Sequence, residues 1–144
     1  MTEDLTRPDP LPAGADHAHR LARLDPRACV LVVEDESELR EMMALWLETR
    51  NYQVSEAADG LDAVELLEAG LSPDVILLDL AMPRMDGRTF LAGLRASPRH
   101  RHRRVIVASA CLDGEVLPDA DRAFGKPFAP DQLALELDRL ALGE

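Results

Sequence analysis

The chain of 144 residues has few cysteines, few aromatic side chains, an excess of negative charge and no long apolar run. Its two cysteines are too few for a disulfide framework, which indicates a reducing cytoplasm. The net charge of −11 argues against direct binding of DNA or of an anionic membrane by the chain as a whole. No stretch approaches the roughly 18 to 20 apolar residues that span a bilayer. We therefore expect a cytoplasmic protein that contacts neither DNA nor membrane.

Residues 1–27 differ in composition from the rest of the chain. Pro8, Pro10, Pro12 and Gly14 interrupt any regular period, so we expect a flexible N-terminal leader there. Residues 28–144 have the length of one domain, and the 47% hydrophobic content is enough for one core. Because only 3% of the residues are aromatic, Leu, Val, Ile and Ala must fill most of that core.

From Cys29 onward, short aliphatic runs alternate with segments of helical spacing. We predict strands at residues 29–33, 52–56, 75–79, 105–109 and 122–125. We predict helices at residues 37–50, 59–70 and 86–97, and a last helix with Pro130 near its start. This repeated strand–helix order demands a parallel sheet with helices on both faces, which is an α/β fold.

Acidic side chains follow two of the aliphatic runs. Glu34 and Asp35 come directly after the first strand, and Asp79 ends the third. Because the carboxyl ends of parallel strands line the crevice where open α/β sheets bind ligands, we expect these three carboxylates to meet. Such carboxylates repel one another unless they hold a hard cation such as Mg²⁺. The sequence therefore predicts a Mg²⁺ site with one aspartate free for chemistry.

Two further polar residues follow apolar strands at the same edge. Ser109 ends the fourth strand and Lys126 follows the fifth. A carboxylate can attack phosphorus and hold it as an aspartyl phosphate, while metal, ammonium and hydroxyl groups stabilise the phosphoryl oxygens. Simpler interpretations stay open: Glu34 and Asp35 could cap the next helix, Ser109 could be an ordinary strand-end serine, and Lys126 could be solvated.

These residues together resemble the receiver domain of two-component response regulators. The resemblance covers about residues 28–142 and is carried, in order, by Val32-Val33-Glu34-Asp35, Leu77-Leu78-Asp79-Leu80-Ala81-Met82-Pro83-Arg84-Met85-Asp86-Gly87, Val107-Ala108-Ser109-Ala110 and Lys126-Pro127-Phe128. It implies a flavodoxin-like, doubly wound five-stranded parallel sheet with strand order 2-1-3-4-5. The pair Asp86-Gly87 is expected to start a helix where glycine relieves crowding.

The resemblance also implies a function for the acidic residues. Asp79 would accept phosphate from a histidine kinase or a histidine phosphotransfer protein. Mg²⁺ would be held by Glu34, Asp35 and Asp79, with the backbone carbonyl of Ala81 as a further ligand. Such a domain assists its own phosphorylation and dephosphorylation but is not a turnover enzyme.

Ser109 and Lys126 also receive roles from the resemblance. Ser109 would be the switch hydroxyl, and Lys126 would pair with the phosphate. The bond between Lys126 and Pro127 is often cis in relatives, which would hold the lysine in a tight turn.

The chain departs from the family pattern between Ser109 and Lys126. This stretch is shorter than in most receivers, and it contains Gly114 and Pro118, which are poor in a helix interior. We therefore expect a shortened or missing fourth helix. Relatives also carry an aromatic residue at the position that is Ala123 here, whereas Phe124 is shifted by one. Either a bulge restores the geometry or the aromatic relay is absent.

The output of the domain is open to more than one hypothesis. Because the sequence ends just after the last helix, we expect a stand-alone, single-domain receiver that acts on an unknown downstream protein by contact or by onward phosphotransfer. A Mg²⁺-dependent phosphohydrolase is disfavoured, because dehalogenase-type phosphatases need a second Asp where this chain has Ala81.

A ligand-binding module is the alternative to the phosphoacceptor switch. A ligand or partner would act at the fourth-helix region or at a basic run, and phosphorylation would then be minor. That run precedes the fourth strand and reads Arg99-His100-Arg101-His102-Arg103-Arg104. Its simplest interpretation is a solvated loop, and the alternative is a patch for an anion, a nucleotide or a protein.

Overall fold

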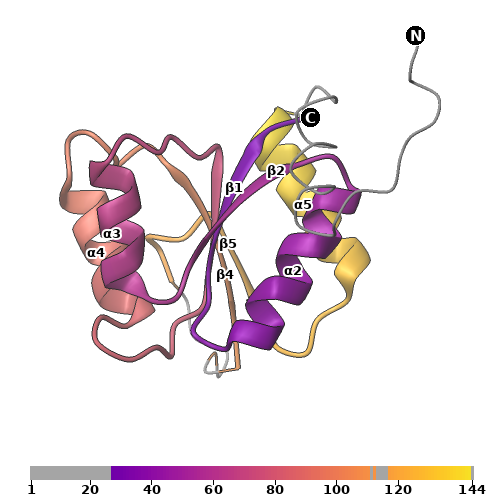
Figure 1. Cartoon of the computed structure of the whole chain (residues 1–144), viewed down its shortest axis with the longest axis horizontal. Coiled ribbons are helices and arrows are strands. Elements are labelled where there is room, and N and C mark those ends of the chain that lie inside the picture. The colour runs from indigo at the N-terminus through magenta and orange to yellow at the C-terminus, as the bar shows by residue number, and fades with distance from the viewer. Residues whose placement is uncertain (1–26, 111, 113–116, 144) are drawn as a thin grey trace, which may run out of the picture.

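The computed structural model describes residues 27–110, 112 and 117–143 and shows one five-stranded parallel sheet (Figure 1). The strand order is β2-β1-β3-β4-β5, as the resemblance implied. The strands are β1 (Cys29–Val33), β2 (Gln53–Ala57), β3 (Val75–Leu78), β4 (Arg104–Ser109) and β5 (Arg122–Gly125). Each predicted strand is confirmed to within one residue. The largest difference is at β2, where Tyr52 lies before the strand and is fully buried.

Helices cover both faces of the sheet. On one face lie α2 (Ser37–Thr49) and α5 (Pro130–Leu142), and on the other lie α3 (Gly60–Glu68) and α4 (Gly87–Ala96) (Figure 1). This arrangement is the predicted doubly wound, flavodoxin-like fold. It follows from the right-handed crossovers that parallel strands require.

The core is divided by the sheet into two layers. Successive side chains of a strand point to opposite faces, and the three central strands are buried on both. In β1, for example, Leu31 and Val33 pack toward α3 and α4, while Val30 and Val32 pack toward α2 and α5. Continuous aliphatic runs are therefore required in these strands, because each position faces a core.

The helix ends explain several of the polar residues in the sequence. Asp59 caps α3 by accepting a hydrogen bond of 2.9 Å from the Asp62 amide, and Asp86 caps α4 by accepting one of 2.8 Å from the Thr89 amide. The N-cap residue of α2 is Glu36, whose own side chain makes no capping hydrogen bond, and its amide donates a hydrogen bond of 3.3 Å to Glu34 Oε2. Neither Glu34 nor Asp35 is therefore the N-cap residue of α2.

Two of the sequence predictions fall wholly or partly outside the described residues. The expected leader, residues 1–27, is described only at Arg27. The expected loss of the fourth helix concerns residues 111 and 113–116, which are also outside, while the described residues 110, 112 and 117–121 contain no helix. Among the helices that the structure describes, none combines the length and apolar character of a membrane span.

Candidate functional site

Three carboxylates meet at the carboxyl ends of β1 and β3, which are neighbouring strands. Glu34 and Asp35 follow β1, and Asp79 follows β3, with Val33 and Leu78 paired in register just before them. Each of the three side chains places an oxygen within 4.8 Å of the others. Glu34 and Asp79 are buried, whereas Asp35 is exposed. The arrangement concentrates negative charge in a cleft with one solvent-facing side, which suits a hydrated, oxygen-bound cation.

Lys126 brings positive charge to this cluster from the end of β5. Its Nζ donates a hydrogen bond of 2.9 Å to Glu34 Oε1, and the Lys126–Pro127 peptide bond is cis, as the resemblance implied. Burial raises the pKa of Glu34, and the charge of Asp79 raises it further, while the hydrogen bond from Lys126 acts in the opposite direction. Glu34 is thus a buried carboxylate whose charge depends on its lysine partner.

The crevice around these residues is open to solvent and has a volume of about 520 Å³. Ser109, which is fully buried at the end of β4, lies on its wall, and so does Ala81. All six residues predicted from the sequence line this crevice: Glu34, Asp35, Asp79, Ala81, Ser109 and Lys126. Sequence reasoning missed Glu36, Leu39 and Ala110, which line it as well. Leu39 carries no chemical signal, because its spacing marks it only as a core residue of a helix.

Gly87 sets how closely α4 approaches the strand that carries Asp79. A Cβ atom at this position would lie 2.3 Å from the Asp79 carbonyl oxygen and 2.7 Å from Leu80 Cα. Both atoms belong to the backbone, so they cannot move aside at low cost. The expectation that glycine relieves crowding at this helix start is therefore confirmed.

Arg84 is a residue of the acceptor loop that sequence reasoning did not assign. Its Nη2 donates hydrogen bonds to Asp59 Oδ1 at 2.9 Å and to Asp62 Oδ1 at 3.0 Å. The guanidinium lowers the pKa of Asp59, which is buried at the start of α3. The backbone of Arg84 has a φ of 63°, in the left-handed region. The loop that follows Asp79 is thereby tied to α3 by an ion pair.

The position of Phe124 in β5 shows whether a bulge restores the aromatic geometry of relatives or the aromatic relay is absent. Strand β5 pairs with β4 in continuous register, with Ala108 opposite Phe124 and Ser109 opposite Gly125. Phe124 packs in the core layer of α2 and α5, and its ring centroid lies 5.9 Å from that of Phe128. Ala123 is exposed. No bulge shifts the described strand, so the aromatic ring faces away from the position used in relatives.

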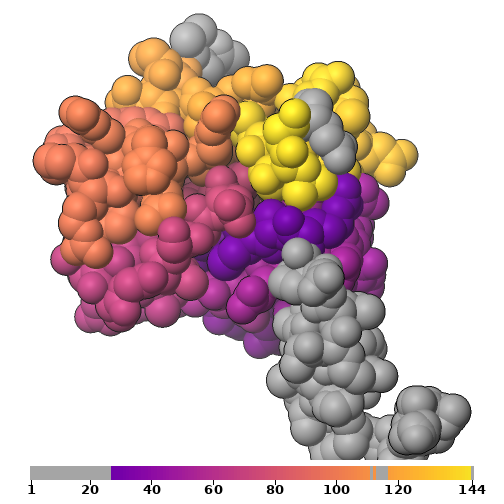
Figure 2. Space-filling model, turned by 90° about the horizontal axis from the view of Figure 1, so that it is seen from above, coloured from indigo at the N-terminus to yellow at the C-terminus, as the bar shows by residue number. Residues whose placement is uncertain are grey.

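The basic run at residues 99–104 is only partly a solvated loop. Arg101, His102 and Arg104 are exposed, but His100 is buried. Arg103 Nη1 donates to the hydroxyl of Ser72 at 3.0 Å, which joins the run to the turn before β3. Figure 2 looks onto the pole where β1 begins (indigo) and α5 ends (yellow), and the run lies at this pole, opposite the carboxylate cluster.

Comparison with known families places this geometry in context. The model of the response regulator receiver domain matches residues 30–138, which is most of the chain. The chain therefore belongs to the response regulator receiver domain family. A receiver domain is the phosphoacceptor of a two-component system and a signalling switch rather than a turnover enzyme, and the acidic cluster stands where such a domain needs it. The phosphohydrolase hypothesis is thereby excluded.

Individual relatives agree with this assignment. The chain is 37% identical over 132 residues to the sensor kinase CckA of Brucella abortus, a match that covers 87% of the chain but only 14% of that kinase. The response regulator TrrA of Thermotoga maritima, solved in complex with Mg²⁺ and BeF, matches with a TM-score of 0.70 and 25% identity, over 78% of this chain and 97% of that one.

A second solved structure is similar to the same degree. The receiver domain of a sensor histidine kinase from Pseudomonas aeruginosa PAO1 matches with a TM-score of 0.70 and 26% identity, over 81% of this chain and 98% of that one. That structure holds a magnesium ion coordinated in its active-site cleft.

Proposed function

We propose that this chain is a phosphorylation switch in which Asp79 accepts a phosphoryl group from a histidine kinase or a histidine phosphotransfer protein. The observation that carries the proposal is the carboxylate cluster, with oxygens within 4.8 Å of one another, beside the ammonium of Lys126. An Asp79 oxygen attacks the phosphorus, the bond to the donor imidazole breaks, and an aspartyl phosphate forms. Output then passes to a downstream protein by contact or by onward phosphotransfer.

The donor set fits Mg²⁺. Glu34, Asp35 and Asp79 offer carboxylate oxygens, and Ala81, on the same crevice wall, offers its backbone carbonyl. Mg²⁺ prefers oxygen ligands and keeps several water molecules, for which the solvent-exposed side of this site leaves room. When bound, the ion neutralises negative charge on the transferring phosphoryl group. The relatives solved with magnesium support this assignment.

Lys126 and Ser109 complete the site from the other side of the crevice. The Lys126 ammonium, held by Glu34 before phosphorylation, can also bind a phosphoryl oxygen on Asp79. Ser109 lies on the strand between those of Asp79 and Lys126, so its hydroxyl is near enough to donate to phosphate after a local shift. We propose these as the phosphate-pairing and switch residues.

The crevice opens beside an apolar groove that suits a protein donor. The groove has a volume of about 280 Å³, and its walls include Met42 and Trp46 of α2 and Phe128 before α5. Leu39 lines both the groove and the crevice, and Met42 is 63% exposed. A protein that delivers phosphate to Asp79 must cover the crevice and so meets this groove. Met42→Glu should therefore slow transfer from a protein donor while leaving transfer from acetyl phosphate unchanged.

The finer parts of the proposal concern the rest of the chain. We propose that residues 1–27 are a leader to a receiver domain at residues 28–144, and that the protein acts in the cytoplasm. We further propose that the segment between Ser109 and Arg122 is a shortened replacement of the fourth helix. Because Ala123 is exposed and Phe124 packs on the other layer, the response to phosphate would leave through this segment.

Acetyl phosphate tests the acceptor assignment. With Mg²⁺, the wild-type chain should gain the mass of one phosphate, and the adduct should be lost in mild base. Asp79→Asn should gain none, whereas Asp131→Asn, a change of an exposed acid at the start of α5, should behave as wild type. Normal adduct formation in Asp79→Asn, at another carboxylate, would show that the assignment is wrong.

A further inference from the structure

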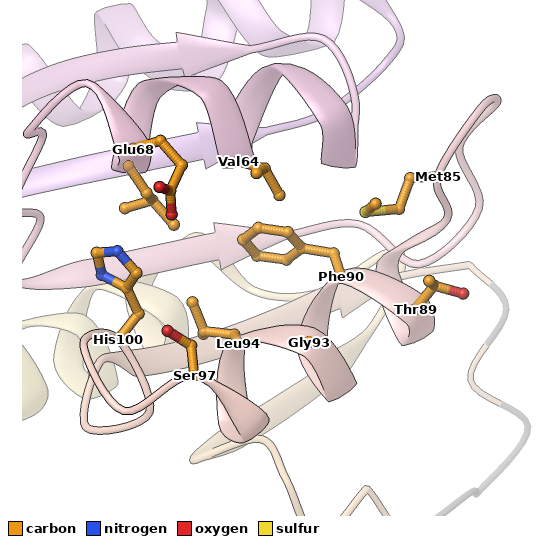
Figure 3. Close-up of a pocket in the computed structure, with 10 residues that line it drawn as sticks. Val64, Glu68, Met85, Thr89, Phe90, Gly93, Leu94, Ser97 and His100 are labelled. Atoms are coloured by element: carbon orange, nitrogen blue, oxygen red, sulfur yellow. The ribbon is translucent and has the colours of Figure 1, made fainter.

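A second cavity lies on the face of the sheet opposite the apolar groove. It sits between α3 and α4 and has a volume of about 270 Å³ (Figure 3). Val64, Phe90 and Leu94 give it apolar walls, and His100 closes one end. For scale, an apolar cavity of about 150 Å³ is enough to bind benzene. The space here would hold one aromatic ring with a small substituent.

His100 supplies the polar end of this cavity. It is only 5% exposed, and neither of its ring nitrogens has a hydrogen-bond partner among the described residues. Burial lowers its pKa, and the charges of Arg103 and Arg99 lower it further, which favours the neutral form of the ring. A neutral imidazole offers one donor and one acceptor. Buried polar groups in proteins are nearly always paired, so this ring lacks a partner that a bound molecule could supply.

Gly93 keeps the cavity open. It lies inside α4, and a Cβ built on it would have no described atom within 4 Å apart from its own helix backbone. Glycine is a poor residue for a helix interior, where almost any side chain would stabilise the helix. Gly93 lines the cavity and is exposed, and a larger residue there would project into open space, so we expect it to narrow the opening.

The charges around the cavity favour an uncharged occupant. Glu68 lies on the cavity wall with its side chain 61% exposed, and its carboxylate is 3.8 Å from Arg99 Nη1. Because these two opposite charges lie next to each other, they offset one another, and neither an anion nor a cation gains a strong unpaired partner at the cavity. A hydroxyl group, which both donates and accepts, can pair with either nitrogen of His100, and an N–H group can donate to the unprotonated nitrogen.

We propose that the cavity between α3 and α4 is a binding site for a small neutral aromatic molecule with one hydroxyl or N–H group, such as a phenol or an aniline. The ring lies against Phe90 and Val64, and the polar group pairs with His100 after a small turn of the imidazole. This site is separate from the crevice of Asp79, so it does not depend on the proposed phosphorylation. In this proposal the basic run at residues 99–104 contributes His100 to the binding of a neutral ligand and does not bind an anion.

Two ligands of nearly equal shape, phenol and toluene, test the polar contact. Titrations of the ¹⁵N-labelled full chain should show phenol binding with a dissociation constant on the order of 0.1 to 1 mM, as expected for so small a ligand. Shifts should centre on Val64, Phe90 and His100. In His100→Leu the preference for phenol over toluene should fall about fivefold, the factor of one net hydrogen bond.

A pair of leucine substitutions on α4 tests the location. Gly93→Leu should fill the cavity and weaken phenol binding at least tenfold, with no loss of melting temperature. Ala92→Leu, which adds the same side chain at an exposed position one residue away, should bind as wild type. Equal binding by the two variants, an unchanged phenol preference in His100→Leu, or shifts that centre on another region would each overturn the proposal. Self-association of the chain through this face without phenol binding would also overturn it.

Discussion

Lys126 Nζ lies 2.9 Å from Glu34 Oε1, so an ion pair joins the end of β5 to the end of β1 across the two strands between them. The same carboxylate belongs to the proposed Mg²⁺ site. In the unphosphorylated protein, Lys126 and Mg²⁺ therefore compete for the Glu34 carboxylate, and each should weaken the interaction of the other with it.

The substitution Lys126→Met separates the effect of the lysine on Mg²⁺ binding from its effect on phosphorylation. Without the ammonium, the carboxylates carry one more uncompensated negative charge, so Mg²⁺ should bind about threefold more tightly or better. Phosphorylation by acetyl phosphate should nevertheless slow by about 10- to 100-fold, because the developing phosphoryl charge loses its cation. Calorimetry and intact-mass time courses measure the two quantities. Weaker metal binding in this variant would mean that Lys126 instead organises the carboxylates for the ion.

Asp35→Asn tests the cost of gathering three carboxylates. Removing one charge relieves repulsion, so the metal-free variant should be more stable than wild type by about 0.5 kcal/mol, the scale of an exposed charge interaction. Wild type should gain melting temperature when Mg²⁺ is added, because the ion binds the folded state, and the variant should lose that gain. Thermal melts with EDTA and with Mg²⁺ provide the comparison. An undiminished response to Mg²⁺ would remove Asp35 from the metal site.

Two glycines of α4 form a matched pair for a test of packing. Gly87→Ala should destabilise the fold by about 1 to 3 kcal/mol, because its Cβ would lie 2.3 Å from the Asp79 carbonyl oxygen. It should also slow phosphorylation, since relief of the clash moves the acceptor backbone. Gly93→Ala enters open space and should stabilise the helix by about 0.5 to 1 kcal/mol. Urea unfolding measures both, and equal effects would contradict this account of Gly87.

The pair between Arg84 and Asp59 predicts a pH dependence. The guanidinium lowers the pKa of Asp59. A carboxyl with a lowered folded pKa stabilises the fold fully above its unfolded value of about 3.9, and the contribution is lost as pH falls through the lowered value. Arg84→Gln should therefore lower the melting temperature by about 2 to 4 °C at pH 7 and by less near pH 2 to 3. Arg101→Gln, at an exposed arginine of the opposite pole, is the control, and an effect of Arg84→Gln that is independent of pH would exclude the ion pair.

The receiver domain should not need the residues that precede Arg27. The Arg27 amide donates to the Asn51 carbonyl at 2.8 Å, and its guanidinium lies 3.4 Å from Asp138, so the domain keeps these contacts when the chain begins at Arg27. We expect such a chain to melt within about 3 °C of the full chain and to be phosphorylated equally well. A much larger fall would show that side chains of residues 1–26 are buried on the domain.

Much of the fold could be predicted because buried strands require apolar residues in a pattern that is visible in the sequence. A strand with a core on both sides must be aliphatic at every position, so the runs of β1, β3 and β4 were visible. The site followed from them, because Glu34 and Asp79 come directly after such a run and Ser109 ends one. Helix starts were visible at Asp59 and Asp86, where capping chemistry is local.

The features that were missed depend on contacts between distant segments. The partners of Arg84 precede it by more than twenty residues, and a single arginine in a loop gives no sign of them. The burial of His100 depends on how α3 and α4 pack, so a run of alternating basic residues suggested only a solvated loop. For Phe124 the sequence showed the one-residue shift, but whether a bulge corrected it depended on the pairing of β5 with β4.

The division of the core by the sheet has a consequence for how many signals the molecule can receive. The groove beside α2 and the cavity between α3 and α4 lie on opposite faces, and the buried central strands separate them. A protein in the groove and a small molecule in the cavity therefore do not compete for space, so both can be bound at once. Any influence of one on the other has to pass through the central strands, whose side chains pack into both layers, and its coupling free energy is the same in both directions. If both proposed sites are used, one domain can receive two signals at the same time, one on each face of its sheet.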